Sequence, residues 1–333
     1  MTILASNPLP EQHVLGDYIL GSLLSTGGFS MVYLAHDQQQ IPRAIKEYFP
    51  CALAKREGET RVIPVSEETV PLFQHGLKCF FEEARALAAI THPNVVRVTD
   101  IFRANETVYM AMQYVRGRTL QFHIKRHRRQ FTERFLRAIV TNLLNGLREV
   151  HSRKLLHLDI KPENIYLAMD GRPVLLDLGA ARYALGESPF RFHPMLSGGY
   201  AAPEQYRNGE QLGPWTDVYA VGAALYSCVT GTRPISAEER VAGKELPPAR
   251  DLAETQYSDE FFGIIDNCMQ LDATTRPQSA FVLQKALLGS TLAGKVPESC
   301  PLDQSQIAPH LSHGAYSLAM VDRKSTRLNS SHQ

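Results

Sequence analysis

The chain has 333 residues, of which 44% are hydrophobic, enough for one large two-lobed domain or two ordinary domains. Its 35 basic and 34 acidic residues nearly cancel, which argues against a nucleic-acid binder, because that class usually carries a basic excess. The N-terminus lacks a basic start followed by an apolar core, and no apolar segment is long enough for a bilayer, so we expect no signal peptide and no membrane span.

The first part of the chain is rich in predicted strands. After a flexible lead over residues 1–15, apolar residues predict two strands around the turn STGG and three more at 44–49, 95–102 and 107–115. Helical spacing of Phe80, Ala84, Leu87 and Ile90 predicts a helix over 79–90. Residues 51–75 follow neither pattern, and we expect them to be irregular.

The second part is mainly helical. Thr132 is the expected N-cap of a helix over 131–154, and Thr216 and Gly231 are the expected start and stop of a buried helix. Serines predict caps for two further helices, over 258–270 and 279–289. Between these helices, residues 165–177 predict a hairpin that turns at Asp170-Gly171.

The segment HLDIKPEN, residues 157–164, carries the strongest chemical pattern. Asp159, Lys161 and Asn164 lie in a loop that enters the predicted hairpin, and Asp177 ends the hairpin's second strand. A hairpin returns its far end to its start, so we expect Asp177 beside Asn164 and Asp159. Carboxylate and amide oxygens suit Mg²⁺, and a lysine suits a phosphate. The set therefore indicates phosphoryl transfer, which depends on positioning and charge neutralisation.

With these motifs in view, the chain resembles a bacterial Ser/Thr protein kinase of the eukaryotic-like family. HLDIKPEN resembles the catalytic loop, DLG the metal-binding triplet, AIK the third-strand lysine motif, AAPEQ the APE segment and STGGFSMVY the glycine-rich loop. The resemblance implies an α+β, bilobal kinase fold. A small lobe over 16–115 would hold a five-stranded antiparallel β-sheet and one main helix, and a mainly helical lobe would cover 116–289.

The resemblance also implies a role for each motif residue. Lys46 would hold the α- and β-phosphates of ATP and pair with Glu83, which stands nine residues before His92. Asp159 would take the proton of the acceptor hydroxyl, and Lys161 would stabilise the transferring phosphoryl group. The metal ligands for Mg²⁺ would be Asn164 and Asp177. The expected nucleotide-binding residues are Ser25, Gly27, Gly28, Phe29, Val32, Ala44, Lys46, Met112 as gatekeeper, Gln113 and Val115 in the hinge, and Tyr166.

Other positions would support this site by resemblance. Asp217 would anchor the backbone of the catalytic loop, and Glu204 would form a buried ion pair with Arg276. Ser197 would touch Asp159 and Lys161, and Lys161 itself implies Ser/Thr acceptors in protein substrates. The hydrophobic spine between the lobes would comprise Leu87, Val98, His157 and Leu178.

Three departures from the family pattern stand out. Leu158 replaces the Arg that grips an activation-loop phosphate in many members, so we expect activity without phosphorylation of that loop. Ser25 and Ser30 stand where glycines are usual, and serine lacks glycine's access to positive φ. Between Lys46 and Glu83 lie 36 residues, so 51–75 are interpreted as an insertion, a surface flap near the helix that bears Glu83.

Two other functions also fit parts of the sequence. A catalytically weak pseudokinase, acting as an ATP-binding or scaffolding module, is the second hypothesis because of Ser25 and Ser30. A kinase of small molecules is less favoured, because AAPEQ resembles a peptide-docking segment. The run KRHRRQ at 125–130 favours a solvated helix end over a site for an acidic substrate or a membrane surface.

The cysteines and the C-terminal tail bear on the protein's location and extent. The five cysteines are scattered, which favours a reducing, cytoplasmic location over secretion. Residues 290–333 predict a linker or tail. Its last stretch, 323–333, differs in composition, and we interpret it as adapter-derived and non-native, so that the true protein would continue further.

Overall fold

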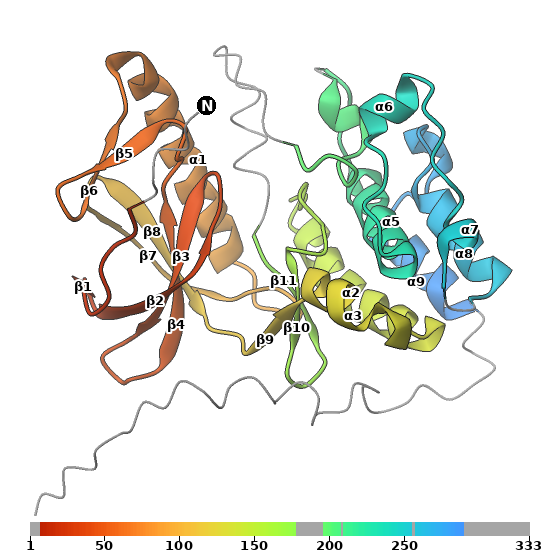
Figure 1. The fold of residues 1–333 in the computed structure, drawn as a ribbon, viewed down its shortest axis with the longest axis horizontal. Helices are drawn as coiled ribbons and strands as arrows, with labels where there is room; N and C mark the ends of the chain where they lie inside the picture. The colour runs from red at the N-terminus through yellow and green to blue at the C-terminus, as the bar shows by residue number, and fades with distance from the viewer. Residues whose placement is uncertain (1–6, 178–195, 208, 255–256, 290–333) are drawn as a thin grey trace, which may run out of the picture. The chain divides into compact units, whose positions relative to one another are not determined.

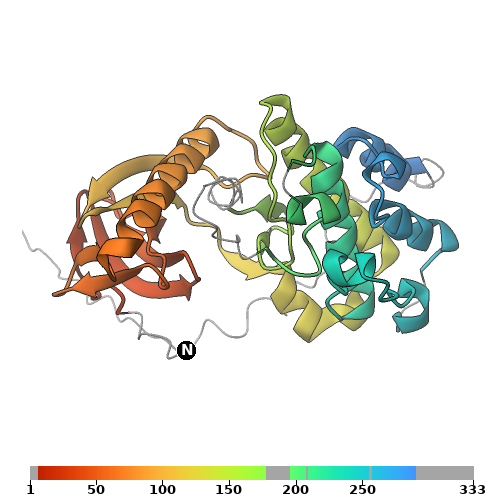
Figure 2. The ribbon, with the colours of Figure 1, turned by 90° about the horizontal axis from the view of Figure 1, so that it is seen from above.

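A computed structural model of the chain describes residues 7–177, 196–207, 209–254 and 257–289. The predicted kinase fold is confirmed: antiparallel strands and one long helix build the first lobe, and helices build most of the second (Figure 1). Figure 2 shows the strands of the first sheet and α1 gathered in one part and the remaining helices in the other.

The first lobe is built on one antiparallel sheet with the strand order β1-β2-β3-β4-β8-β7. It has six strands rather than the expected five, because the two-residue strand β1 pairs with β2. Two residues are too few to show an alternating pattern, so the sequence did not indicate β1. The strands are β1 (Val14–Leu15), β2 (Tyr18–Thr26), β3 (Ser30–His36), β4 (Pro42–Tyr48), β7 (Val98–Ala104) and β8 (Thr107–Gln113).

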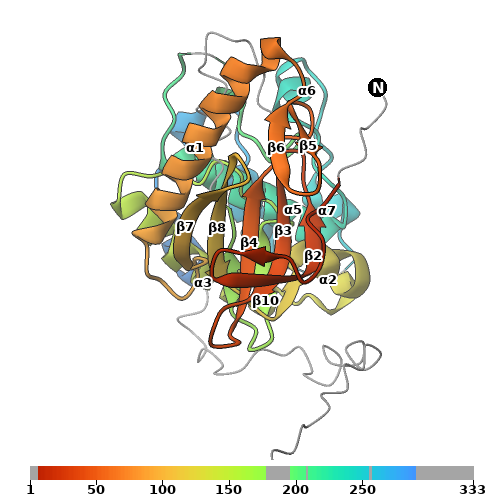
Figure 3. The ribbon, with the colours of Figure 1, turned by 90° about the vertical axis from the view of Figure 1, so that its left-hand side faces the viewer.

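The prediction that residues 51–75 are irregular is wrong. Strands β5 (Ala54–Glu57) and β6 (Arg61–Pro64) form a hairpin, and η1 (Glu67–Thr69) leads into α1 (Val70–Ala88). Helix α1 therefore begins nine residues before the predicted start at 79. It packs against β7 and β8 (Figure 3), and it bears Glu83.

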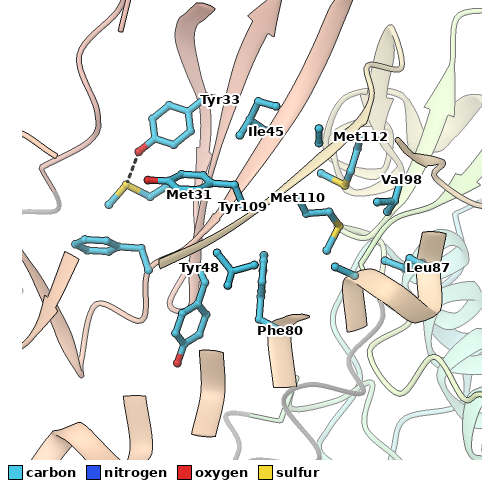
Figure 4. Close-up of a cluster of buried hydrophobic side chains, with 14 of the residues drawn as sticks. Met31, Tyr33, Ile45, Tyr48, Phe80, Leu87, Val98, Tyr109, Met110 and Met112 are labelled. Atoms are coloured by element: carbon cyan, nitrogen blue, oxygen red, sulfur yellow. Dashed lines mark hydrogen bonds between the residues drawn. The ribbon is translucent and has the colours of Figure 1, made fainter. Parts of the chain in front are cut away.

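The N-terminal segment over residues 7–15, expected to be a flexible lead, also packs on the sheet. Leu9 and Leu15 are buried members of the same apolar core as Tyr33 and Ile45. Figure 4 shows Met31, Tyr33 and Tyr109 together in this core, apart from Met112, Val98 and Leu87. For the strand residues the two groups follow from the register, since cross-strand partners share one face of a sheet, and Leu87 of α1 packs on the side of Met112 and Val98.

The second lobe begins with a small sheet of order β11-β10-β9. Its elements are β9 (Gly117–Thr119), α2 (Leu120–His127), η2 (Arg128–Gln130), α3 (Glu133–Ser152), β10 (Ile165–Ala168), β11 (Pro173–Leu175), η3 (Pro203–Tyr206), α5 (Pro214–Thr230), α6 (Ala237–Val241), α7 (Ala249–Leu252), α8 (Asp259–Cys268), η4 (Ala273–Thr275) and α9 (Ala280–Gly289). Helix α3 packs against α5, α9 and β11. Within the described ranges, no helix combines the length and apolar character that crossing a membrane requires.

Most predicted helix ends are confirmed. The Thr132 hydroxyl accepts a hydrogen bond from the Phe135 N–H, and the Ser258 hydroxyl does the same for Phe261. Gly231 ends α5 with φ of 74°, as its position predicted. The predicted N-cap Thr216 is wrong, because α5 begins after Gly213 and the Thr216 hydroxyl accepts the N–H of that glycine from inside the first turn.

Candidate active site

Lys46 projects from one face of the sheet together with the residues expected to surround the nucleotide. In the register of β3, β4 and β8, Val32 lies opposite Lys46 and Ala44 lies opposite Met112. These side chains therefore share the face of Lys46, since cross-strand partners and alternate residues point to the same side. The opposite face, with Tyr33 among its residues, belongs to the buried core.

The Lys46 ammonium connects three elements that lie far apart in the sequence. It lies 2.9 Å from Asp177 Oδ1, beyond β11, and 3.7 Å from Glu83 Oε1 on α1. Lys46 and Glu83 are almost fully buried, whereas the Asp177 side chain is 27% exposed. The Lys46 ammonium lies between two carboxylates, and the more accessible of them, Asp177, is the one open to a ligand.

The catalytic loop is held by Asp217, a fully buried carboxylate at the start of α5. Its oxygens accept the backbone N–H groups of His157 and Leu158, each at 2.8 Å, and contact His151 Nε2 at 2.8 Å. Burial alone would raise the pKa of Asp217, but the hydrogen bond and charge of His151 and the charge of His157 hold that pKa below its usual value.

Leu158 occupies an unusual backbone conformation, with φ of 60°. Its N–H is held by Asp217, and its carbonyl accepts a hydrogen bond from the Gln205 side chain at 3.0 Å. The loop is thus fixed on both sides of this residue, which stabilises a left-handed conformation that a leucine rarely adopts. Gln205 follows Glu204 in AAPEQ, and its contact with the catalytic loop was not predicted.

Asp159, Lys161, Asn164 and Ser197 form one hydrogen-bonded group. Lys161 Nζ lies 2.9 and 3.0 Å from the two Asp159 oxygens and 2.7 Å from the Ser197 hydroxyl. That hydroxyl also donates to Asp159 Oδ1 at 2.7 Å. The expected contacts of Ser197 with both residues are therefore present.

The hairpin brings Asp177 to the catalytic loop as its topology predicted. The Leu176 N–H donates to the Asn164 backbone carbonyl at 2.9 Å, and His157 Nε2 contacts the Leu176 carbonyl at 3.0 Å. Asn164 uses its amide nitrogen to donate to Asp159, which leaves its side-chain carbonyl oxygen as the possible metal donor. With a carboxylate oxygen of Asp177, this donor set fits Mg²⁺.

In the part of the chain that the structure describes, no cluster of three His, Cys, Asp or Glu side chains could hold a metal ion alone. Mg²⁺ usually keeps only one or two carboxylate ligands and relies on substrate phosphates for others. An Asn-Asp pair fits that arrangement.

The glycine-rich loop joins β2 to β3. Ser25 and Ser30 lie in these two strands, and neither has positive φ. The conformational objection to serine at these positions therefore does not apply to this structure. Gly27 is also free of positive φ, and an added Cβ would meet Ser30 O at an ordinary 3.5 Å. What glycine offers at position 27 is therefore the absence of a side chain, which lets a ligand approach the backbone closely.

The expected hinge residues lie where β8 ends. Met112 is buried next to the last residue of this strand, Gln113 is exposed, and Val115 is half-buried. Tyr166 on β10 packs against the apolar core that contains Met112, and its hydroxyl donates to Gly117 O at 2.8 Å. The structure thus ties Tyr166 to the segment that directly follows the hinge.

Elsewhere in the second lobe, Glu204 and Arg276 form the expected ion pair. Two parallel contacts of 2.7 and 3.0 Å join the guanidinium to the carboxylate, and the Thr216 hydroxyl adds a third at 2.9 Å. Of the expected spine, Leu87, Val98 and His157 are buried, whereas Leu178 lies outside the described residues.

A buried polar network in the first lobe was missed. Glu47, directly after Lys46, accepts hydrogen bonds from Tyr33 and Tyr109, both at 2.8 Å, and from the Arg56 guanidinium at 2.8 and 3.0 Å. The exposed fractions of the Arg56 and Glu47 side chains are 1% and 0%. The only available signal was the strand pattern of AIKEYF, which places Glu47 on the face opposite Lys46.

Comparison with known proteins agrees with this geometry. The family model of the protein kinase domain matches residues 18–288. The probable serine/threonine-protein kinase SCO3848 of Streptomyces coelicolor is 29% identical over 278 residues, which make up 80% of this chain and 38% of that protein. The probable serine/threonine-protein kinase PknB of Lactococcus lactis is 31% identical over 165 residues, or 49% of this chain and 26% of that protein. The chain thus spans less than two fifths of the length of these curated relatives.

Solved structures give the same result. PpkA-294 in its apo form superposes with a TM-score of 0.78 at 33% sequence identity, covering 85% of this chain and 100% of that one. A variant of the Mycobacterium tuberculosis PknI kinase domain gives a TM-score of 0.63 at 20% identity over 86% of this chain and 100% of that one, a likeness of fold alone. The chain belongs to the protein kinase family, as a relative of the bacterial serine/threonine kinases.

Proposed function

We propose that the chain transfers the γ-phosphoryl group of ATP to serine and threonine hydroxyls of protein substrates, with Mg²⁺ as the metal. Nucleotide and substrate would bind between the residues of the Lys46 face and those of the catalytic loop. The observation that carries the proposal is the contact of Lys46 with both Glu83 and Asp177. It joins the sheet, helix α1 and the end of the hairpin at one point.

Lys46 would hold the α- and β-phosphates as a fixed positive charge. Asn164 and Asp177 would hold Mg²⁺, which supplies neutralisation of phosphate charge when bound. Asp177 contacts Lys46 through one oxygen. The carboxylate is therefore oriented before the nucleotide arrives, which reduces the reorganisation needed during the reaction.

Asp159 would orient the acceptor hydroxyl and accept its proton. As the acceptor oxygen forms its bond to the γ-phosphorus, the bond from that phosphorus to the β–γ bridging oxygen breaks, and ADP leaves with the electron pair. Lys161, which contacts Asp159 and the Ser197 hydroxyl, would stabilise the negative charge on the transferring group. When no substrate is present, the Ser197 hydroxyl would hold the side chains of Asp159 and Lys161 in position.

The proposal is tested by transfer of labelled γ-phosphate from Mg-ATP to dephosphorylated casein. We expect the label on serine and threonine, and we expect chelation of the metal to stop transfer. Asp159→Asn should lower the rate by about 10²–10⁴-fold, the usual contribution of a general base. Asp170→Asn, an exposed carboxylate change in the neighbouring hairpin, is the matched control and should retain the wild-type rate.

If the wild type binds ATP but transfers no more phosphate than Asp159→Asn does, the proposal is overturned in favour of the scaffolding alternative. Transfer that persists in Asp159→Asn would overturn the role of Asp159.

We further propose a reducing, cytoplasmic location. The support is that Cys51, Cys79, Cys228 and Cys268 are free thiols in the described ranges.

A further inference from the structure

Residues 49–64, which comprise the β5–β6 hairpin and the turn before it, contact three parts of the proposed nucleotide site. We call this segment the clip. Figure 3 shows β5 and β6 beside the N-terminal part of α1. The clip also reaches the glycine-rich loop and the strand that bears Lys46, as the following contacts show.

The first contact is with the glycine-rich loop. The Phe49 N–H donates to the Phe29 carbonyl at 2.9 Å, and the Cys51 N–H donates to the Gly28 carbonyl at 3.1 Å. The Phe29 ring packs on a small apolar cluster formed by Leu53 of the clip and Leu72 of α1. The tip of the loop is therefore held by two backbone hydrogen bonds and one side-chain contact.

The second contact is with helix α1. Leu72 lies in the first turn of this helix, and Leu53, its partner in the apolar cluster, lies in the clip. The Thr69 hydroxyl, immediately before the helix, donates to the Leu53 carbonyl at 3.4 Å. One residue of the clip thus contacts both the loop tip and the helix that carries Glu83.

The third contact is the buried pair of Arg56 and Glu47. Arg56 places both terminal nitrogens on the Glu47 carboxylate, donates to Thr60 O within the hairpin at 2.8 Å, and donates to Asn7 O at 2.7 Å. A fully buried ion pair has few alternative positions, because moving either partner leaves a charge unpaired. This pair therefore fixes the clip to the residue that follows Lys46.

We propose that the clip positions the glycine-rich loop for nucleotide binding, with Leu53 as its central positioning residue. Ordering a loop when a ligand arrives reduces affinity, and a loop that is already held avoids this penalty. The clip ties the loop to Lys46 through Arg56 and to the Glu83 helix through Leu72. The inference rests on the proposed function, since it assumes that this face binds ATP.

The test uses the full chain with the variant Leu53→Ala, which removes the side chain between Phe29 and Leu72. We expect the Kd for Mg-ATP, measured by calorimetry, to rise about tenfold, equivalent to about 1.4 kcal/mol. The KM for a peptide substrate should stay unchanged, because Asp159, Lys161 and Ser197 lie outside the clip. Amide hydrogen exchange at Phe49 and Cys51, whose N–H groups hold the loop, should become faster.

Two controls separate positioning from loss of stability. Lys55→Ala changes an exposed side chain of the same hairpin and should leave the Kd unchanged. Leu147→Ala, a buried residue of α3, should lower the melting temperature and leave the Kd unchanged at temperatures where the variant is folded. If Leu53→Ala does not fold, Leu53→Val removes a single methylene, and a smaller rise in Kd is expected in the same direction.

A double-mutant cycle gives an independent measurement. If Leu53 acts through Phe29, the change Leu53→Ala in a Phe29→Ala background should raise the Kd by less than about twofold. The inference would be overturned if the folded Leu53→Ala variant had the wild-type Kd for ATP. It would also be overturned if the KM for the peptide rose by the same factor as the Kd for ATP. A wild-type chain that binds no ATP would instead overturn the proposed function.

Discussion

Replacing Asp217 by Asn removes the charge and one of the two oxygens that hold the catalytic loop. In the wild type, Oδ1 accepts the Leu158 N–H, and Oδ2 accepts the His157 N–H and contacts His151. An amide has one oxygen, so in the Asp217→Asn variant an NH₂ group would face one of these donors. We therefore expect one buried N–H of the loop to lose its partner.

The magnitude follows from these contacts. A hydrogen bond to a charged group contributes about 1.5–3 kcal/mol, and a buried N–H without a partner costs about 1–3 kcal/mol. Together they predict a loss of roughly 2.5–6 kcal/mol, a large fraction of a typical total stability of about 5–15 kcal/mol. The amide keeps most contacts with its oxygen at the Oδ2 position, so the Leu158 N–H is the one released, and Leu158 should then leave its left-handed conformation. A displacement of Asp159 by about 1 Å would then lower kcat by about 10²-fold.

The assays are urea denaturation and γ-phosphate transfer, with Asp251→Asn, an exposed position on α7, as the matched control. The pH dependence adds a second test. Since the pKa of Asp217 lies below its ordinary value of 3.8, its stabilising contribution is present above that pH and is lost as the pH falls towards the lowered folded-state pKa. The variant should lack this loss. An Asp217→Asn protein with unchanged denaturation midpoint and kcat would refute the anchoring role.

Three further predictions follow from other contacts. Removing all phosphate from residues 180–201 should leave kcat unchanged, because Leu158 offers no guanidinium to a phosphate; loss of activity after phosphatase treatment, monitored by mass spectrometry, would contradict this. Arg276→Met should lower the free energy of unfolding by about 3–5 kcal/mol, because Glu204 would stay buried without its charge partner; a urea titration that shows under about 1 kcal/mol would contradict it. Burial lowers the pKa of His123 to about 4, so between pH 6.5 and about 4 the unfolded state binds a proton that the folded state does not, and stability falls as the pH falls; His123→Leu should reduce that fall in urea midpoints between about pH 7 and about pH 5, and an unchanged fall would argue against it.

The catalytic loop was predictable because its geometry is local. Asp159, Lys161 and Asn164 lie within six positions, and a hairpin must return Asp177 to them whatever the rest of the fold does. Val32 and Ala44 were expected near the nucleotide from the resemblance alone, and only the register of β3, β4 and β8 in the structure shows that they lie on the face of Lys46. Roles for these residues came from resemblance to a family and stay predictions.

The clip was not predictable, because its charged residues are paired across the fold. Arg56 in a segment of mixed composition is typical of a solvated loop, and only the folded sheet shows that Glu47 lies against it. Gly76 concealed the first turns of α1, since a glycine inside a helix weakens the helical pattern. The charged run at 125–130 also has partners that its local sequence does not indicate. Arg128 and Arg129 contact Glu254, more than a hundred residues away.

The clip and Leu158 bear on the same problem, the placement of helix α1. A kinase with an arginine before the catalytic aspartate can use a phosphorylated activation segment to order its site, and Leu158 cannot take part in such a contact. Here Leu53 contacts α1 at Leu72, and Arg56 is fixed to Glu47 beside Lys46. The Lys46–Glu83 pair is therefore supported from the outer side of the sheet, by residues that need no modification. If both proposals hold, loss of the clip should weaken ATP binding equally in phosphorylated and phosphate-free protein, since Leu158 gives an activation-loop phosphate no contact through which it could replace the clip.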